Sequence, residues 1–332
     1  MRASGASAPG KAVLIGEYAV LEGAPAVAMA LDRRARVGLA SGNGPGHAVR
    51  SLNSGARARF GPMPGGGLAW QDGDAQAFAL VEHVWQAVRP EPRGSLVLTL
   101  DTRAFYDPVT GAKLGFGSSA ALAVALAAAL AGEAAPEPVR EAARRAHMAF
   151  QGGRGSGVDI ATAAHGGVVG YRRESAQVEH LPWPAGLEVC LLWSGRAADT
   201  PAAIDRLARA RAEAAPALAS LVAAAEAAYR GWARGAAEAL EALSAWAGAL
   251  FRFARDCRLD VFGAGHEALY DEASRRGLVY KPCGAGAGDT GAAFARDRGA
   301  LDAFAAWAAQ RGFARVAASL EARGVTLESQ AV

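Results

Sequence analysis

The sequence predicts an α/β fold divided into two domains, and three observations support this. A chain of 332 residues can bury a large core and most naturally splits in two. Short apolar runs such as "SLVLTL" (95–100) are typical of strands, whereas the Ala-rich runs that follow are typical of helices. The composition changes at "LPWPAG" (181–186), where two prolines flank Trp183. We therefore predict one domain over residues 1–180 and another over 181–332.

The order of elements follows from apolar periodicity and from Gly and Pro punctuation. In the first domain we expect strands within 12–31 and at 95–100, helices from 117 and over about 139–150, then a loop, short helix and strand over 152–173. The segments "SGNGPGHAVR" (41–50) and "FGPMPGGG" (60–67) are expected to be turn-rich connections. In the second domain we expect a strand at "LEVCLLW" (187–193) and two or three helices within 202–248.

Composition excludes several functional classes. The formal charge of +3 is small and Arg is spread along the chain, so we expect no nucleic-acid partner. The longest apolar run, "AALAVALAAALAG", is too short to span a bilayer, and the N-terminus lacks a signal-peptide core. The widely spaced cysteines, Cys190, Cys257 and Cys283, have no zinc spacing and favour a reducing cytoplasm. We expect a cytoplasmic enzyme for an acidic small molecule; no signal for an oligomeric state is present.

Three lysines, Lys11, Lys113 and Lys281, are the only ones in the chain, and each borders a Gly-rich segment. Arg supplies the other basic side chains apart from His. A compositional bias toward Arg explains why Lys is scarce, but it does not explain why the three lysines lie beside Gly-rich segments. Because a compact ammonium on a flexible stem suits a phosphoryl group that moves during reaction, the positions indicate phosphate chemistry.

The first loop, residues 113–119 of "AKLGFGSSAALAVAL", has the chemistry of a phosphate cradle. A helix that begins near Ser118 aims backbone N–H groups and its positive dipole end at an anion, and Ser119 can offer a hydroxyl to phosphate-bound Mg²⁺. A simple N-cap by Ser118 is the plainer alternative. Gly115, Gly117 and Ala120 also match the dinucleotide fingerprint, but "DTRAFYDPVTGAK" separates them from the preceding strand. The P-loop order of residues is absent.

Two further Gly-rich segments carry polar groups. The second loop, residues 153–159 of "GRGSGVDIAT", places Asp159 at a helix start behind Gly155, Ser156 and Gly157, and Arg154 and Ser156 add anion-binding donors. The third loop, residues 283–289 of "KPCGAGAGDTG", is expected to be flexible enough to close over a ligand. An Asp that merely stabilises a helix start and a plain chain reversal are the structural alternatives. Three such anion cradles together favour a phosphate site.

These segments resemble the GHMP small-molecule kinases. "PGKAVLIGEYAVLEG" is similar to the family's first motif, "KLGFGSSAA" to its ATP loop and "CGAGAGDTGAAF" to its third motif. "AHMAFQGGRGSGVDIATAAHGG" and "LLWSGRAADT" resemble the phosphomevalonate kinase branch in particular. The motifs run from residue 8 to residue 292, so the resemblance covers nearly the whole chain.

The resemblance implies a two-domain fold, with a βαβ-type N-terminal domain, a ferredoxin-like C-terminal α/β sandwich and an ATP cleft between them. It implies ATP and Mg²⁺ as cofactors and transfer of the γ-phosphoryl group to 5-phosphomevalonate, a small phosphorylated substrate of isoprenoid precursor synthesis. The implied catalytic residues are Lys11 and Asp159, and Ser119 would hold the metal. Residues implied to bind ATP are Lys113, Gly115, Gly117, Ser118, Ser119 and Ala120. Residues implied to bind the substrate are Lys11, Lys113, Arg154, Ser156, Gly157, Thr200, Gly284, Ala285 and Gly286.

Some positions depart from the family pattern and bear on the acceptor. Met148 stands where mevalonate kinases have a Mg²⁺-binding Glu, eleven residues before the Asp. Ala287 stands where Gly is usual and Thr290 where Cys is usual. A phosphorylated acceptor is already mostly ionised near neutral pH, so Asp159 would only orient the acceptor, Lys11 or the metal. An alcohol such as mevalonate would require Asp159 to take the hydroxyl proton or at least hold it. Mevalonate kinase, a phosphorylating decarboxylase, a Rossmann-type oxidoreductase and a non-catalytic ATP-binding protein are the alternatives.

Overall fold

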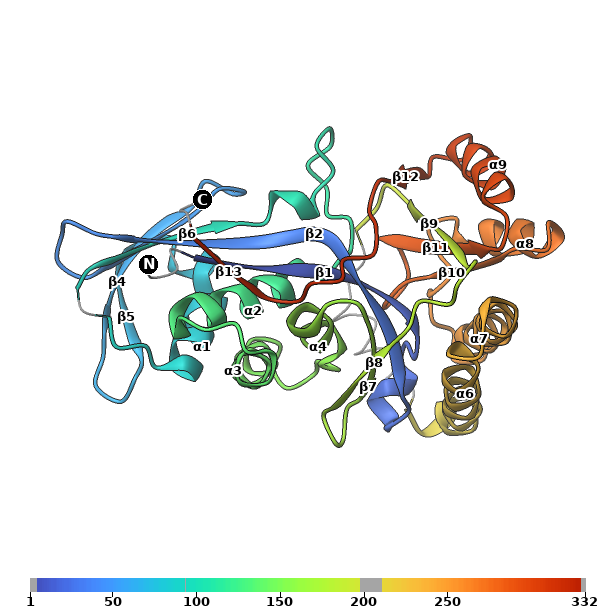
Figure 1. Cartoon of the computed structure of the whole chain (residues 1–332), viewed down its shortest axis with the longest axis horizontal. Coiled ribbons are helices and arrows are strands. Elements are labelled where there is room, and N and C mark those ends of the chain that lie inside the picture. Colours follow the sequence, from blue (N-terminus) through green and yellow to red (C-terminus); the bar gives the residue numbers. More distant parts are fainter. Residues whose placement is uncertain (1–4, 93, 198–210, 330–332) are drawn as a thin grey trace.

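A computed structural model describes residues 5–92, 94–197 and 211–329. Strands from the first 181 residues and one from the C-terminus form a nine-stranded sheet, and four later strands form a second sheet (Figure 1). The nine strands are β1 (Gly5–Ile15), β2 (Ala26–Ser41), β3 (His47–Ser51), β4 (Arg57–Pro62), β5 (Leu68–Gly73), β6 (Leu96–Asp101), β7 (Val168–Arg172), β8 (Gln177–Leu181) and β13 (Thr326–Glu328). Short 3₁₀ turns lie at Ala19–Glu22, Ala75–Phe78 and Arg103–Phe105.

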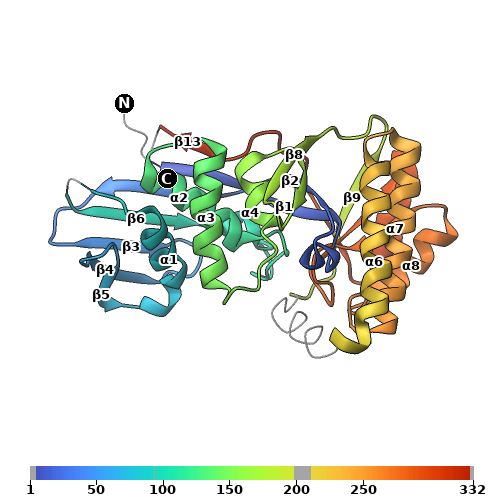
Figure 2. The same ribbon diagram turned by 90° about the horizontal axis from the view of Figure 1, so that it is seen from below.

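The large sheet has the order β13-β1-β2-β6-β3-β4-β5, and β7 and β8 extend it from one end of β2. Most neighbours are antiparallel; β3 and β6 are parallel because the chain crosses over between them through α1 (Ala79–Val88). Helices α1, α2 (Ser118–Ala131), α3 (Pro136–Phe150) and α4 (Val158–His165) lie together on one side of this sheet (Figures 1 and 2).

Helix α2 is the central helix of this layer. It contacts α1, α3 and α4 as well as β1 and β2. Residues around its whole circumference are buried, from Ala120 to Ala129 apart from Leu122. A helix surrounded in this way must be apolar all round, and its many alanines allow close approach to the sheet. Packing thereby fixes the N-terminus of α2, where the first loop ends.

The second sheet has the order β10-β11-β9-β12, formed by β9 (Glu188–Trp193), β10 (Val279–Pro282), β11 (Thr290–Ala295) and β12 (Ala314–Val316). Leu191 packs with α6 (Arg211–Trp232) and α7 (Ala236–Asp256), whereas Leu192 packs with α8 (His266–Arg275) and α9 (Arg298–Ala309). Because successive strand residues point to opposite faces, helices cover both sides of this sheet. The α/β fold class is confirmed.

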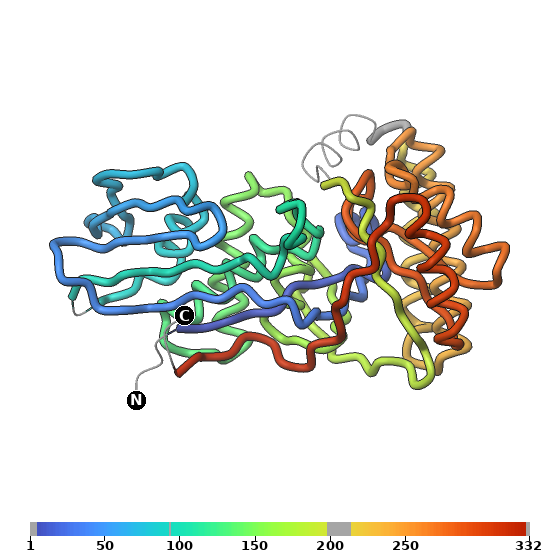
Figure 3. Tube along the Cα trace, turned by 90° about the horizontal axis from the view of Figure 1, so that it is seen from above, coloured from blue at the N-terminus to red at the C-terminus, as the bar shows by residue number. Residues whose placement is uncertain are grey.

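The C-terminal segment leaves the second sheet after β12 and runs back along the large sheet, where β13 pairs with β1 (Figure 3). Arg34 fastens it: its guanidinium, 8% exposed, donates to the carbonyl of Gly324 at 2.7 Å and lies 3.3 Å from the Glu321 carboxylate. The predicted division between residues 180 and 181 falls at the last residue of β8 and does not account for this return of the C-terminal segment to the large sheet. The division into two domains stays a prediction.

One part of the expected element order is wrong. The segments 41–50 and 60–67 were expected to be turn-rich connections, but the first contains most of β3 and the second contains the end of β4 and leads directly into β5. Phe60 is fully buried and packs edge-on against Trp85, so this region contributes to the core. In the described ranges no single helix is long and apolar enough to cross a membrane, although the sharply bent pair α2 and α3 meets the criterion by length and composition alone.

Candidate active site

Lys11 lies where the three loops meet. It is on β1, and its backbone N–H donates to the carbonyl of Phe116 in the first loop at 2.9 Å. A Cβ added to Gly117 would lie 3.3 Å from Lys11 Cε and 3.9 Å from Asp159 Cβ. A Cβ added to Gly284 of the third loop would lie 3.7 Å from Lys11 Nζ. The Lys11 side chain therefore lies between the first and third loops, beside Asp159.

The first loop is shaped to receive an anion. Gly115 and Gly117 have φ values of +83° and +74°, which favour glycine, and Gly117 precedes α2. The first intrahelical bond runs from the N–H of Ala121 to the carbonyl of Gly117, so the amides of Ser118, Ser119 and the buried Ala120 lie in the first turn. There they point along the positive end of the helix dipole. The alternative of a side-chain N-cap by Ser118 is wrong, because Gly117 is the cap and no side chain caps the helix.

Ser119 has a partner that the sequence analysis missed. Its hydroxyl lies 3.1 Å from Nε2 of His147, which is 2% exposed in the last turn of α3. Position 148, where mevalonate kinases are expected to have a Mg²⁺-binding Glu, is Met in this chain. The side chain that contacts Ser119 is instead that of the preceding residue, His147. If the hydroxyl donates to His147, its oxygen lone pairs remain available to a cation.

The second loop brings Asp159 to the start of α4. Gly157 caps this helix with φ of +86°, and a Cβ there would lie 2.6 Å from the hydroxyl of Tyr171. Asp159 Oδ1 accepts from the N–H of Ile160 at 3.0 Å, and Ser156 Oγ from the N–H of Val158 at 3.4 Å. Arg154 is exposed. Asp159 is thus held by its own helix start with its side chain beside Lys11.

The third loop is held in place, contrary to the expectation that it is flexible. The carbonyl of Ala285 accepts from the hydroxyl of Tyr18 at 2.6 Å, and a Cβ on Gly286 would lie 2.7 Å from Val261 Cα. Thr290 Oγ1, just after the loop, donates to the carbonyl of Leu114 at 2.7 Å. The third loop is therefore tied to the first.

One predicted substrate contact, Lys113, lies at the margin of this arrangement. Lys113 is exposed, and its carbonyl accepts from the indole N–H of Trp193 at 3.1 Å. Its ammonium makes no ion pair with any residue of the described ranges. Thr200 lies outside the described residues. The structure thus brings together Lys11, Asp159 and the first and third loops, with Lys113 at the edge.

Lys281 has a structural role, unlike the other two lysines. It is fully buried and forms an ion pair with Glu17, which is 1% exposed. The Lys281 ammonium also donates to the carbonyl of Val13 at 3.0 Å, and Glu17 Oε2 accepts from the indole N–H of Trp246 at 3.0 Å. This pair joins the end of β1 to β10 and α7. The interpretation of all three lysines as phosphate ligands is therefore wrong for Lys281.

The residues of the first loop suit the phosphates of a nucleotide, because the amides of Ser118 and Ser119 lie in the first turn of α2 and the Lys11 side chain lies beside Gly117. Among the residues the structure describes, no three His, Cys, Asp or Glu side chains group as a metal site. Mg²⁺ characteristically keeps several waters and takes one or two protein ligands with substrate phosphates, so Ser119 together with a nucleotide suits it.

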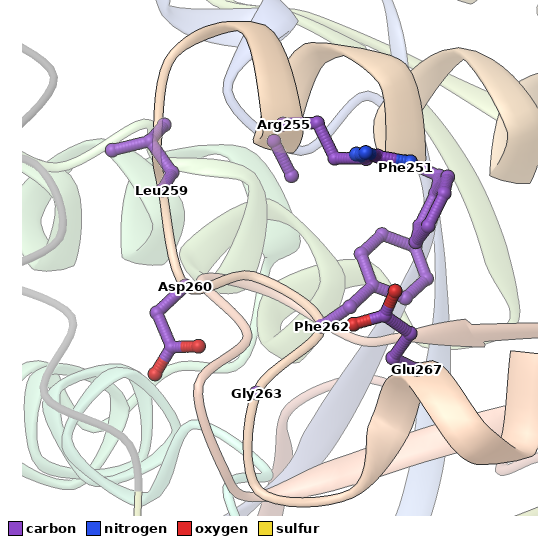
Figure 4. A pocket seen from close by; sticks show the side chains of 8 residues that line it. Phe251, Arg255, Leu259, Asp260, Phe262, Gly263 and Glu267 are labelled. Atoms are coloured by element: carbon purple, nitrogen blue, oxygen red, sulfur yellow. The ribbon is translucent and has the colours of Figure 1, made fainter.

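A small pocket of about 110 Å³ opens elsewhere, on α7 and the segment before α8 (Figure 4). Its lining combines the rings of Phe251 and Phe262 with Arg255 and Glu267. In the part of the chain that the structure describes, none of the predicted site residues lines it. We therefore do not assign the phosphate chemistry to this pocket.

Comparison with known proteins finds similarity to one kinase family over part of the chain. Residues 96–167, which contain the first and second loops, match the family described as GHMP kinases N terminal domain. A mevalonate kinase from Aeropyrum pernix is 31% identical over 58% of this chain, and a phosphomevalonate kinase from Streptomyces sp. is 28% identical over 61%. These matches span 58% and 64% of those relatives' own lengths.

Solved structures extend the similarity in fold to nearly the whole chain. A Lin0012 protein from Listeria innocua has a TM-score of 0.84 at 18% identity, covering 98% of this chain and 99% of its own. Streptococcus pneumoniae phosphomevalonate kinase, in complex with phosphomevalonate and AMPPNP, has a TM-score of 0.71 at 18% identity, covering 95% and 99%. The resemblance is thereby confirmed: residues 96–167 match the GHMP kinases N terminal domain, and the whole chain shares the fold of these solved structures.

Proposed function

We propose that this protein is an ATP-dependent phosphotransferase that transfers the γ-phosphoryl group of ATP to 5-phosphomevalonate, giving mevalonate 5-diphosphate. The observation that carries the proposal is the position of Lys11, whose side chain lies between the glycines of the first and third loops and beside Asp159. An ammonium there can neutralise charge on both donor and acceptor. Phosphoryl transfer needs mainly such positioning and charge neutralisation.

In this proposal the first loop and the N-terminus of α2 bind the ATP phosphates, and Ser119 would be the residue that holds Mg²⁺. The metal, when bound, neutralises charge on the phosphate oxygens. Lys11 holds the transferred group in line with the acceptor, which lies beside Ser156, Gly157 and Gly284. An acceptor phosphate oxygen forms a bond to the γ-phosphorus while the bond to the β-phosphate oxygen breaks, and ADP leaves.

Features at the end of α3 favour a phosphorylated acceptor. Position 148 carries Met, and His147 occupies the space beside Ser119. A phosphate acceptor has a second pKa near 6 and is already mostly ionised at pH 7, so no strong base is required. Asp159, which accepts a hydrogen bond from the N–H of Ile160, is then an orienting group for Lys11 or the acceptor.

Mevalonate is the second candidate acceptor, because the mevalonate kinase of Aeropyrum pernix is 31% identical over 200 residues. With an alcohol as acceptor, Asp159 would have to take the hydroxyl proton as the new bond forms. The two acceptors therefore assign Asp159 different roles.

ADP release measured across mevalonate, 5-phosphomevalonate, homoserine and galactose tests the proposal. We expect turnover with 5-phosphomevalonate and little with the others. Turnover of mevalonate alone would replace the acceptor and make Asp159 a general base. Carbon dioxide release would indicate a decarboxylase, and preference for NAD(P) over ATP an oxidoreductase. ATP binding without ADP formation on any acceptor would leave a binding protein and overturn the proposal.

A further inference from the structure

A buried pair of polar side chains lies behind the third loop, away from the groups assigned to the reaction. His266 is the first residue of α8 and is fully buried. Its Nε2 lies 3.0 Å from the carbonyl of Gly288, and its Nδ1 lies 2.6 Å from the hydroxyl of Tyr280 on β10. Both ring nitrogens of His266 thus have a hydrogen-bond partner.

The partners determine where the imidazole proton lies. The carbonyl of Gly288 can only accept, so Nε2 must carry the proton and donate it. A neutral imidazole has one such proton, so Nδ1 accepts from the Tyr280 hydroxyl. Burial lowers the pKa of His266 to about 4, and the nearby ammonium of Lys281 acts in the same direction. The ring therefore stays neutral in the tautomer that bonds the third loop.

The residues around Tyr280 and Gly288 accommodate the hydrogen bonds of His266. A Cβ on Gly291 of the neighbouring strand β11 would lie 2.5 Å from Tyr280 Cζ, so only glycine there leaves room for the tyrosine hydroxyl end. Gly288 has φ of +155°, and its neighbours Ala287 and Asp289 have φ of +64° and +55°. Such a run of left-handed conformations persists only where the surroundings hold it.

The carbonyl that His266 bonds directly precedes Asp289, the third-loop residue that meets the first loop. A Cβ on Gly115 would lie 2.5 Å from Asp289 Cγ, so the Asp289 side chain packs directly against Gly115, where only glycine leaves room for it. The N–H of Asp289 donates to the carbonyl of Arg196 at 2.6 Å, and its carbonyl accepts from Ser194 at 2.9 Å. A shift of Gly288 would therefore be transmitted to the phosphate cradle.

We infer that Tyr280 and His266 are positioning residues that set the shape of the third loop and, through Asp289, its contact with the first loop. The effect on turnover rests on the proposed kinase activity, whereas the effect on the loop does not. Neither side chain needs to touch a substrate.

Amide hydrogen exchange on the full chain tests the inference without any ligand. The N–H groups of Ala287 and Asp289, bonded to Val261 and Arg196, report on the third loop. In His266→Phe, which keeps a ring but removes the donor, we expect both amides to exchange about tenfold faster or more, the equivalent of ~1.4 kcal/mol. Tyr280→Phe, a milder change, should give about a fivefold increase. His266→Gln, which retains an N–H donor, should restore part of the protection.

His47→Phe is the matched control. His47 is also a buried histidine, 4% exposed, whose Nδ1 accepts from the N–H of Leu96 in the large sheet. Loss of the His47 imidazole should lower the free energy of unfolding without changing amide exchange at Ala287 and Asp289. A spectroscopic check is independent of any variant: the ¹⁵N shifts of His266 should show a neutral ring protonated at Nε2. Unchanged loop exchange in His266→Phe, or a ring protonated at Nδ1, would overturn the inference.

Turnover then separates this inference from the proposed function. If the kinase proposal holds, His266→Phe should lower kcat about tenfold at saturating substrates, and His266→Gln should recover part of it, while His47→Phe should not change kcat. If the parent protein turns over none of the acceptors, the kinase proposal fails, yet the exchange result still decides the role of His266. Faster loop exchange with an unchanged kcat would overturn the link from loop shape to the reaction.

Discussion

The first and third loops are both rich in glycine, but they use backbone conformation in opposite ways. In the first loop the positive φ values belong to Gly115 and Gly117, and the following amides lie in the open first turn of α2. In the third loop Ala287 and Asp289 also have positive φ, and their amides are bonded to the carbonyls of Val261 and Arg196. The first loop thus offers its N–H groups to a ligand, whereas the third uses them to hold its own shape.

The difference shows that glycine content alone does not identify a binding loop. Left-handed conformation costs a non-glycine residue about 1–2 kcal/mol, so two such residues in the third loop require compensation from their surroundings. Hydrogen bonds from Tyr18, His266 and Thr290 supply it. The third loop is better regarded as a rigid wall of the site than as a lid.

The largest expected effect comes from forcing the two loops apart with Gly115→Ala. The added Cβ would lie 2.5 Å from Asp289 Cγ, at a φ of +83°. Because displacement of reacting groups by about 1 Å can cost about 100-fold, we expect kcat/KM for ATP to fall by about 100-fold or more. Steady-state kinetics with 5-phosphomevalonate measures this.

Gly111→Ala controls for backbone strain alone. Gly111 has φ of +68°, and nothing lies within 4 Å of an added Cβ. We expect a stability loss of about 1 kcal/mol and turnover close to that of the parent. Equal losses of activity in both variants would mean that strain, and not the contact between the loops, is responsible.

Ser119→Ala tests whether the first loop contributes a side chain as well as its amides. The backbone should still bind phosphate, but loss of the hydroxyl removes a Mg²⁺ contact and the partner of His147. Changes around metal ligands typically cost about 10- to 100-fold in metal affinity, so turnover at limiting Mg²⁺ should fall by that order.

Nucleotide binding with and without Mg²⁺ provides a second readout for Ser119→Ala, because affinity for metal-free ATP should change little. Ser274→Ala is the control, since Ser274 Oγ bonds only its own helix at the carbonyl of Tyr270. Turnover of Ser119→Ala within about twofold of the parent at limiting Mg²⁺ would make Ser119 an ordinary helix residue.

Lys113→Met tests the exposed edge of the first loop. A phosphorylated acceptor adds about 1.5–2 negative charges, and a charge-assisted contact is worth about 1.5–3 kcal/mol. We therefore expect the KM for 5-phosphomevalonate to rise about tenfold or more, with a much smaller change in the KM for ATP.

Arg103→Met is the control for Lys113, because Arg103 is an exposed cation of the same region that pairs with Asp101. Its substitution should leave both KM values unchanged. Equal weakening toward both substrates in Lys113→Met would assign the lysine to ATP, and no change in either would make it a solvated flank of the turn.

Short-range patterns in the sequence were sufficient to predict much of this site. The start of α2 after Gly117, Asp159 at the start of α4 and the strand at β9 all followed from short-range periodicity and punctuation. β4 and β5 were missed because Gly and Pro interrupt the alternation around Phe60 and Leu68, although packing against α1 makes both residues buried. Tertiary burial there outweighs local propensity.

The contacts that could not be predicted join residues far apart in sequence. His147 reaches Ser119 from 28 residues away, His266 reaches Gly288 from 22, and Lys281 reaches Glu17 from 264. The return of β13 to β1 likewise depends on the whole fold. The clearest overlooked signal was Glu17, a carboxylate inside the apolar run "AVLIGEYAVL", because a charge in such a run needs a buried partner.

The smallest expected effect is a gain from Ala287→Gly, which relaxes the third loop without altering its contacts. Ala287 has φ of +64° and its N–H bonds the carbonyl of Val261. Relief of about 1–2 kcal/mol of strain, offset by about 0.4–1 kcal/mol of added unfolded-state entropy, should leave a net gain of about 0.5–1 kcal/mol. Thermal unfolding should show Tm higher by about 1–2 °C. Ala176→Gly, at φ of +52° in the turn between β7 and β8, should gain similarly. A gain at Ala176 with a loss at Ala287 would mean that the methyl group of Ala287 itself stabilises the third loop, which would then depend on side-chain packing as well as on hydrogen bonds.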